Sequence, residues 1–123
     1  MAQSSTTLHE QQLPADVVDR HRAIVSLMEE LEAVDWYDQR AYACTDPELK
    51  QILEHNRDEE KEHACMVLEW LRRNDPGWDE YLRKFLFRQG SITHAEGAAE
   101  GGSGIPGGRS LGIGSLKERE RKP

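Results

Sequence analysis

A break at the letters CTDPE of residues 44–48 divides the helical pattern of residues 15–73 into two parts. Asp46 is suited to cap a helix that begins at Pro47, because the missing N–H of proline needs no partner in the first turn. Upstream, the letters LPAD before Val17 are typical of a helix start. The pattern therefore predicts two long helices, over residues 15–43 and about 47–73, joined by a tight turn.

A second break, NDPG at residues 74–77, ends the second long helix. The letters WDEYLRKFLF after it predict a short third helix over residues 78–87. Two long helices joined by a tight turn pack as an antiparallel hairpin. The predicted fold class is all-α, with a two-helix hairpin followed by a short C-terminal helix.

Composition changes abruptly near residue 89. All eight aromatic residues lie between Trp36 and Phe87, whereas nine of the ten glycines lie between Gly90 and Gly114. Core-forming and flexible residues thus barely overlap. We expect four regions: a flexible N-terminus (1–12), a helical domain (13–88), a flexible linker (89–109) and a C-terminal peptide (110–123).

Charge and hydrophobicity exclude several functions. Residues 1–88 hold 19 of the 23 acidic residues and 11 of the 16 basic ones, so the helical part is acidic and lacks a basic surface for nucleic acid. No apolar run could cross a membrane, and the N-terminus lacks the features of a signal peptide. We therefore expect a cytoplasmic protein in which Cys44 and Cys65 are free thiols. With 37% hydrophobic residues in 123 positions, its own core is small, so partners are expected.

Each long helix carries an apolar stripe at the helical period, and each stripe is polar at its centre. The first stripe comprises Ala23, Leu27, Glu30, Val34, Tyr37 and Ala41. The second comprises Leu49, Leu53, Asn56, Glu60, His63, Val67 and Trp70. An ionised carboxylate in such a stripe is costly to desolvate unless a cation accompanies it, and neither stripe contains Lys or Arg.

The turn sets which of these polar residues meet. An antiparallel turn centred between Thr45 and Asp46 places residue 61 level with Glu30, so Glu60 and His63 lie on either side of that level. A Glu-x-x-His pair alone also fits a buried hydrogen bond that only fixes helix pairing. The third polar residue at the same height favours a metal site, and carboxylate with imidazole suits iron or manganese.

These three residues match one half of a ferritin-like di-iron carboxylate site, in which helices of a four-helix bundle contribute Glu and Glu-x-x-His. The chain supplies only that half. A symmetric homodimer of two hairpins would complete both the four-helix bundle and the site. The small core and the incomplete site therefore both predict a homodimer.

The segments EELEAVDWYDQRA and HNRDEEKEHACMVLEWLRR resemble those of the encapsulated ferritins, and the resemblance covers about residues 8–88. It implies a half-ferritin that dimerises around a di-iron centre and assembles into an annular decamer. It also implies a ferroxidase that oxidises Fe²⁺ with O₂ and delivers iron for mineral storage inside an encapsulin nanocompartment. The implied di-iron ligands are Glu30, Glu60 and His63.

The same resemblance implies roles for further residues. Tyr37 corresponds to a tyrosine beside the di-iron centre. Glu29 and Glu32, with Trp36 adjacent, correspond to secondary metal positions that could take Ca²⁺ or another divalent cation. Without the resemblance, the acids would be assigned to a solvated surface and the indole to packing.

The C-terminal letters RSLGIGSLKERERKP resemble an encapsulin-targeting peptide, whose spaced apolar residues dock on the inner wall of the shell protein. Such residues in a tail carry little information alone, but here they follow a predicted half-ferritin site. The residues concerned are Leu111, Gly112, Ile113, Gly114, Ser115 and Leu116.

Two other functions remain open from the sequence. A ferritin-like di-metal peroxidase or catalase would use much the same ligands. A non-catalytic helical oligomerisation module would bind no metal with defined stoichiometry.

Overall fold

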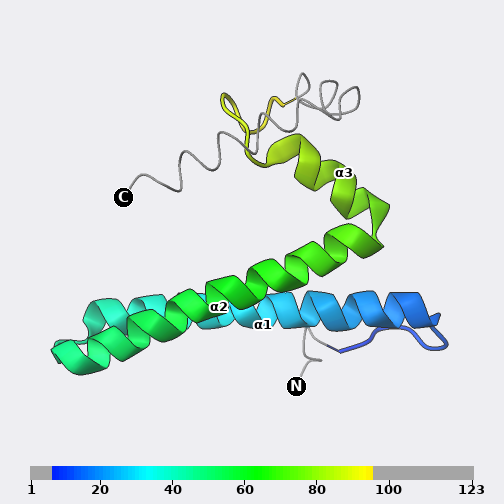
Figure 1. Cartoon of the computed structure of the whole chain (residues 1–123). Helices are drawn as coiled ribbons and strands as arrows, with labels where there is room; N and C mark the ends of the chain where they lie inside the picture. The colour runs from blue at the N-terminus through cyan, green and yellow to red at the C-terminus, as the bar shows by residue number, and fades with distance from the viewer. Residues whose placement is uncertain (1–6, 96–123) are drawn as a thin grey trace. The chain divides into compact units, whose positions relative to one another are not determined.

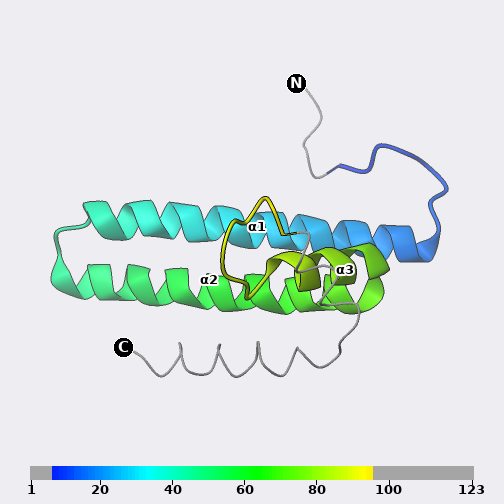
Figure 2. The same ribbon diagram turned by 90° about the horizontal axis from the view of Figure 1, so that it is seen from above.

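The computed structural model describes residues 7–95 and contains three helices in that segment. They are α1 (Ala15–Ala43), α2 (Pro47–Asn74) and α3 (Pro76–Phe85). Helices α1 and α2 lie side by side and antiparallel, as both views of the ribbon show (Figures 1 and 2). The predicted all-α fold, with a hairpin and a short third helix, is confirmed. Among these three helices, none is long and apolar enough to cross a membrane.

The turn between α1 and α2 has the predicted chemistry. The Asp46 carboxylate accepts a hydrogen bond from the backbone N–H of Leu49 at 2.8 Å, which caps the first turn of α2. On the other side, the backbone N–H of Cys44 donates to the carbonyl oxygen of Arg40 at 2.9 Å and closes the last turn of α1. Only residues 44–46 separate the two helices, and the backbone groups at both helix ends have partners within this turn. The short turn therefore joins α1 and α2 as an antiparallel hairpin.

Helix α3 starts earlier and ends earlier than the sequence pattern predicted. Asp75 is its N-cap and accepts a hydrogen bond from the backbone N–H of Gly77 at 2.9 Å, while Pro76 occupies the first turn. The Asp-Pro pair thus begins a helix here just as it does at the start of α2. Asp75 also opens a second compact unit, separate from the hairpin unit that ends at Asn74.

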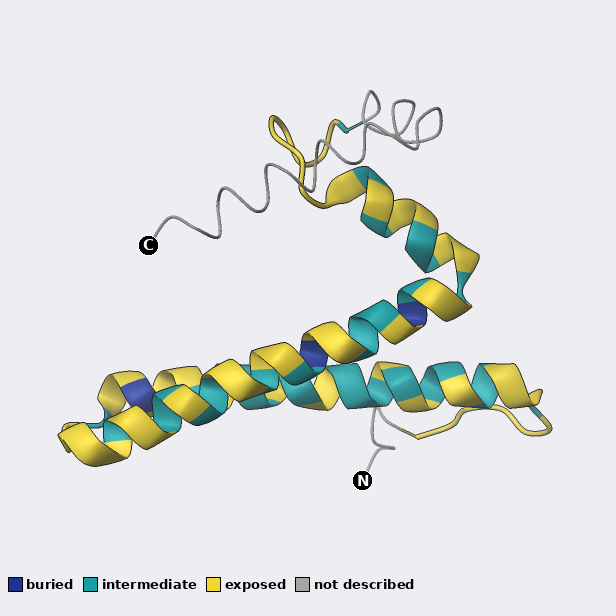
Figure 3. Cartoon of the chain, in the orientation of Figure 1, coloured by how far each residue is buried: buried dark blue, intermediate teal, exposed yellow. Residues whose placement is uncertain are grey.

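The hairpin has a very small core of its own. Its buried residues are Ala41, Ala64 and Leu71, and most of the surface of α1 and α2 is intermediate or exposed (Figure 3). Large apolar side chains remain open to solvent, including Leu31 at 56% and Met66 at 60%. Folding of this hairpin removes little apolar surface from contact with water. Packing against a further apolar surface would therefore stabilise it.

The most buried face of α2 differs from the stripe predicted for it. Ala64 and Leu71 are buried, whereas Leu49 and Trp70 at the two ends of the predicted stripe are 47% and 38% exposed. The two ends of the predicted stripe therefore lie at the edge of the α1–α2 seam, whereas its central residues Glu60 and His63 meet Glu30 across the seam. The cause is the breadth of the apolar surface of α2, which extends beyond what one neighbouring helix covers.

We predict that Leu71→Ala lowers the free energy of unfolding by about 2–5 kcal/mol, because the only fully buried large side chain of the described segment would leave a cavity. Leu49→Ala removes the same atoms from an exposed position of the same helix and should cost less than about 1 kcal/mol. Chemical denaturation followed by circular dichroism measures both. Equal costs would show that Leu71 does not form the core of the hairpin.

Candidate metal centre

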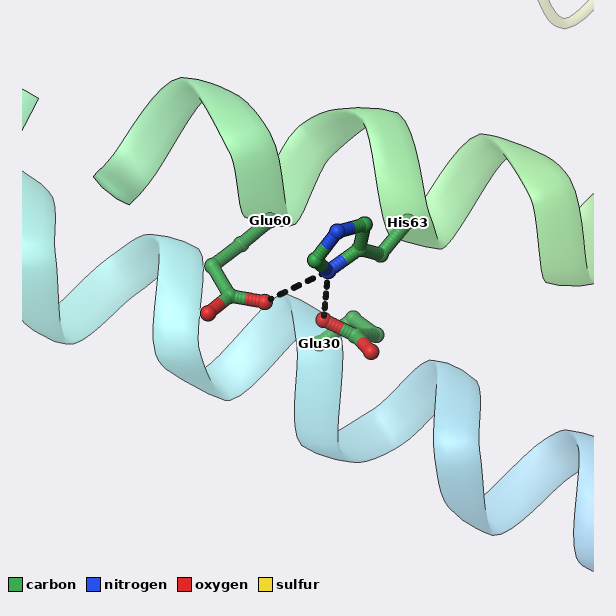
Figure 4. A group of neighbouring side chains, drawn as sticks. All are labelled: Glu30, Glu60 and His63. Carbon is green, nitrogen blue, oxygen red and sulfur yellow. Dashed lines mark hydrogen bonds and ion pairs between the residues drawn. The ribbon is translucent and has the colours of Figure 1, made fainter. Parts of the chain in front are cut away.

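Three potential metal ligands converge at the middle of the hairpin. Glu30 projects from α1, and Glu60 and His63 project from α2 one helical turn apart, so that all three side chains point toward one another (Figure 4). Their meeting confirms the register derived from the turn. Among residues 7–95, no other group of three His, Cys, Asp or Glu side chains comes together in this way.

The distances suit a metal ion. Nδ1 of His63 lies 3.2 Å from Oε1 of Glu60 and 3.5 Å from Oε1 of Glu30. One ligand atom from each residue falls within 4.8 Å of the other two. Bonds from a metal to oxygen or nitrogen of about 2.0–2.2 Å allow two ligands of one ion to lie up to about 4.4 Å apart. The three side chains therefore need only small movements to share an ion.

The group is electrostatically coupled in the absence of a cation. A hydrogen bond between the two carboxyl groups raises the pKa of Glu30 and lowers the pKa of Glu60. Desolvation disfavours the charged imidazole, but the hydrogen bond to Glu60 and the charge of Glu30 outweigh it, so the pKa of His63 is raised. A metal ion would replace the shared protons by binding the deprotonated forms of all three groups.

The group lies on a half-open flank of the hairpin. The side chains of Glu30 and Glu60 are 25% and 24% exposed, and that of His63 is 44% exposed. A groove of about 400 Å³ continues this flank one turn further along both helices. Its lining residues are Asp19, Arg22, Ala23, Ser26, Met66, Val67 and Trp70. One hairpin therefore presents the ligands on a surface without enclosing them.

The tyrosine predicted beside the centre and the tryptophan predicted beside the secondary metal positions share a cationic neighbour. The guanidinium group of Arg40 lies 5.4 Å from the ring centroid of Tyr37 and 5.8 Å from that of Trp36. Tyr37 is half-buried, and Trp36 is 49% exposed. Both distances are within the range of a cation–π contact. The proposed roles of the two rings beside a metal remain predictions.

Other predicted site residues are not part of the ligand group. Glu29 and Glu32 are exposed on α1 and do not belong to the cluster of potential ligand atoms. Their role as secondary metal positions remains a prediction. The predicted targeting residues 111–116 lie outside the described residues. Cys44 is half-buried and Cys65 exposed, and both are free thiols.

The sequence reasoning missed a polar contact between the helices. Arg57 of α2 forms an ion pair with Asp38 of α1 at 3.1 Å. The register did not point to it, because residue 53 is level with Asp38 and Arg57 lies one helical turn from that level, so that only its long side chain reaches across. The hydrophobic pattern did not reveal it either, since both positions are outside the apolar stripes.

Comparison with known proteins places these observations in a family. Residues 5–89 match the EncFtn-like family model. The chain is 60% identical to an encapsulated ferritin-like protein of Rhodospirillum rubrum, over 95% of this chain and 92% of the relative. It is 58% identical to a ferritin-like protein of Thermotoga maritima, over 77% of this chain and 82% of that protein.

A solved structure has the same fold. The crystal structure of protein ne0167 from Nitrosomonas europaea superposes with a TM-score of 0.68 at 58% sequence identity, covering 71% of this chain and 98% of the other. The chain belongs to the EncFtn-like family of encapsulated ferritin-like proteins.

Proposed function

We propose that this protein is a ferroxidase that oxidises Fe²⁺ to Fe³⁺ with O₂ at a di-iron centre formed between two chains. The convergence of Glu30, Glu60 and His63 in the middle of the hairpin carries the proposal. Hard carboxylate oxygens and imidazole nitrogen are ligands that suit iron, and the group contains no thiolate to favour a softer metal. The membership of the chain in a ferritin-like family supports the same metal.

The need for two chains follows from charge and coordination. One hairpin offers two carboxylates and one imidazole, which is too few ligands for a pair of iron ions. A homodimer would offer four carboxylates, whose combined charge balances two Fe²⁺ ions. Packing a second hairpin on the half-open flank would also cover the groove beside the ligands. We extend this to an annular decamer on the basis of the family resemblance.

Within such a dimer each ligand has a distinct task. Glu30 would contribute its carboxylate to the metal pair from α1, while Glu60 and His63 would contribute a carboxylate and an imidazole from α2. Oxidation of two bound Fe²⁺ ions to Fe³⁺ would supply the two electrons that, with two protons, reduce one O₂ to peroxide. The chain contributes geometry and restricts access, and Tyr37 lies on the same face of α1 two turns from Glu30.

We further propose that the protein works inside an encapsulin nanocompartment in the cytoplasm. The relative that matches 95% of the chain is named an encapsulated ferritin-like protein, and this match extends well beyond residue 89, where the family model ends. In this proposal, residues 89–109 are a tether and residues 110–123 an address for the shell protein. The shell would provide the volume for mineral storage that two-helix subunits lack.

We predict that replacing Glu30, Glu60 or His63 by Ala slows Fe²⁺ oxidation by more than about tenfold, because removal of a ligand costs at least as much as removal of its supporting contacts. Helical content should persist, since each side chain is partly exposed. Glu59→Ala is the matched control, because Glu59 neighbours Glu60 but pairs with His55 at 3.1 Å and is 53% exposed. Absorbance of Fe³⁺ under air follows the reaction.

The outcome also separates the alternative functions. Near-normal oxidation in the three ligand variants would remove them from the catalytic centre. Turnover of hydrogen peroxide alone, without Fe²⁺ oxidation by O₂, would identify a di-metal peroxidase or catalase instead. Absence of stoichiometric metal in the intact protein would leave only an oligomerisation module.

We predict that deletion of residues 104–123 abolishes capture by a co-expressed encapsulin shell protein and leaves Fe²⁺ oxidation intact, because none of the three ligands lies there. Changing Leu111, Ile113 and Leu116 together to Asp should have the same effect, since charge is poorly accommodated in apolar pockets. Co-purification with the shell measures capture. Equal packaging of the truncated and intact proteins would place the address in the helical domain.

A further inference from the structure

Arg57 links the two helices close to the candidate metal centre. Its Nη1 atom lies 3.1 Å from Oδ1 of Asp38 on α1, and its Nε atom lies 3.0 Å from Oδ1 of Asp58 on its own helix. The Arg57 side chain is only 23% exposed. A guanidinium group held by two carboxylates has a fixed orientation, because its N–H donors are rigidly arranged in one plane.

The contact is placed to control the register of α2 against α1. Arg57 precedes Glu60 by one helical turn, and Asp38 follows Glu30 by about two turns. The Arg57–Asp38 pair and the His63–Glu30 pair, at 3.1 Å and 3.5 Å, therefore join the same two helices about two turns apart. Sliding α2 by one turn in the direction that carries Arg57 away from Asp38 would break both contacts.

The metal centre needs a contact that fixes the register of α2 against α1, because the hairpin has few buried residues that could fix it. The buried residues are Ala41, Ala64 and Leu71, and of these only Ala64, the neighbour of His63, lies beside the ligand group. Two carboxylates facing each other across the seam also favour separation of the helices whenever both are charged. A fixed contact beside them opposes that separation without occupying a ligand position.

We propose that Arg57 is a positioning residue, whose ion pair with Asp38 holds Glu60 and His63 of α2 in register with Glu30 of α1 for metal binding. Arg57 acts through the helix and has no contact with the three ligands in the pairs described above. This inference rests on the proposed metal centre but not on iron oxidation. If the Arg57–Asp38 contact were only a surface ion pair with no positioning role, its removal would leave the metal affinity unchanged.

Asp38→Asn and Asp58→Asn form a matched pair of variants for the test. Each removes the negative charge of one carboxylate beside the Arg57 guanidinium group, but only Asp38→Asn removes an ion pair between the helices. We expect Asp38→Asn to raise the Kd for Co²⁺ by about tenfold, as supporting contacts of metal ligands typically do. Asp58→Asn should change it by less than about twofold. Titration followed by the visible absorption of bound Co²⁺ reports both affinity and geometry.

The Arg57→Gln variant distinguishes a positioning role of Arg57 from a simple effect of its positive charge on the metal site. Removing a positive charge beside a cation site should tighten Co²⁺ binding if only the net charge matters. The positioning role predicts about tenfold weaker binding and an altered Co²⁺ spectrum. The double variant Asp38→Asn/Arg57→Gln has the net charge of the intact protein, and we expect its affinity to stay as low as that of the single variants, because both remove one shared contact.

The results separate failure of this inference from failure of the proposed function. Circular dichroism must show intact helices, and if one variant loses them, the other single variant decides the question. Equal Co²⁺ affinity in the Asp38→Asn and Asp58→Asn proteins, or tighter binding by Arg57→Gln, would overturn the positioning role alone. Absence of Co²⁺ binding by the intact protein would overturn the metal centre and this inference with it.

Discussion

Two carboxylates and an imidazole face one another across the helix–helix seam, and bringing them together costs free energy when the carboxylates are charged and no cation is bound. The need for a metal ion and for a second chain both follow from this arrangement. Without a cation, the coupling between Glu30 and Glu60 raises one carboxyl pKa and lowers the other, and the pKa of His63 is raised as well. The group thus retains protons that a metal would displace. A structural hydrogen bond would need only two of these side chains. The third makes a cation the simplest way to satisfy them together.

The same seam explains why one chain is insufficient. Its ligands are half-exposed, its groove is open, and its buried residues in the described segment number only three. An isolated hairpin of this kind has apolar surface to cover and coordination positions to fill. In our proposal a second copy meets both needs, so assembly and metal binding stabilise each other. The Arg57–Asp38 pair would then preserve the geometry of each half before the halves meet.

Sequence alone was informative where local chemistry determines the structure. The bounds of α1 and the cap at Asp46 followed from proline and capping signals, and the turn position predicted that Glu30 would meet Glu60 and His63. The start of α3 was misplaced because an Asp-Pro pair can both end one helix and begin the next. Ala64 and Leu71 were missed as core residues because a broad apolar surface does not reveal which part of it faces the neighbouring helix. Long charged side chains such as Arg57 leave no trace in the hydrophobic pattern, although their reach connects the helices.

Anomalous diffraction from crystals of the whole chain loaded with Fe²⁺ would show whether two chains share one pair of metal ions. We expect two iron peaks between two hairpins, each within bonding distance of Glu30, Glu60 or His63 from both chains. A spacing of about 3.5–4 Å between the peaks would match a dinuclear centre. A single iron bound entirely within one hairpin, or iron bound only away from these three residues, would rule out a metal pair shared between two chains.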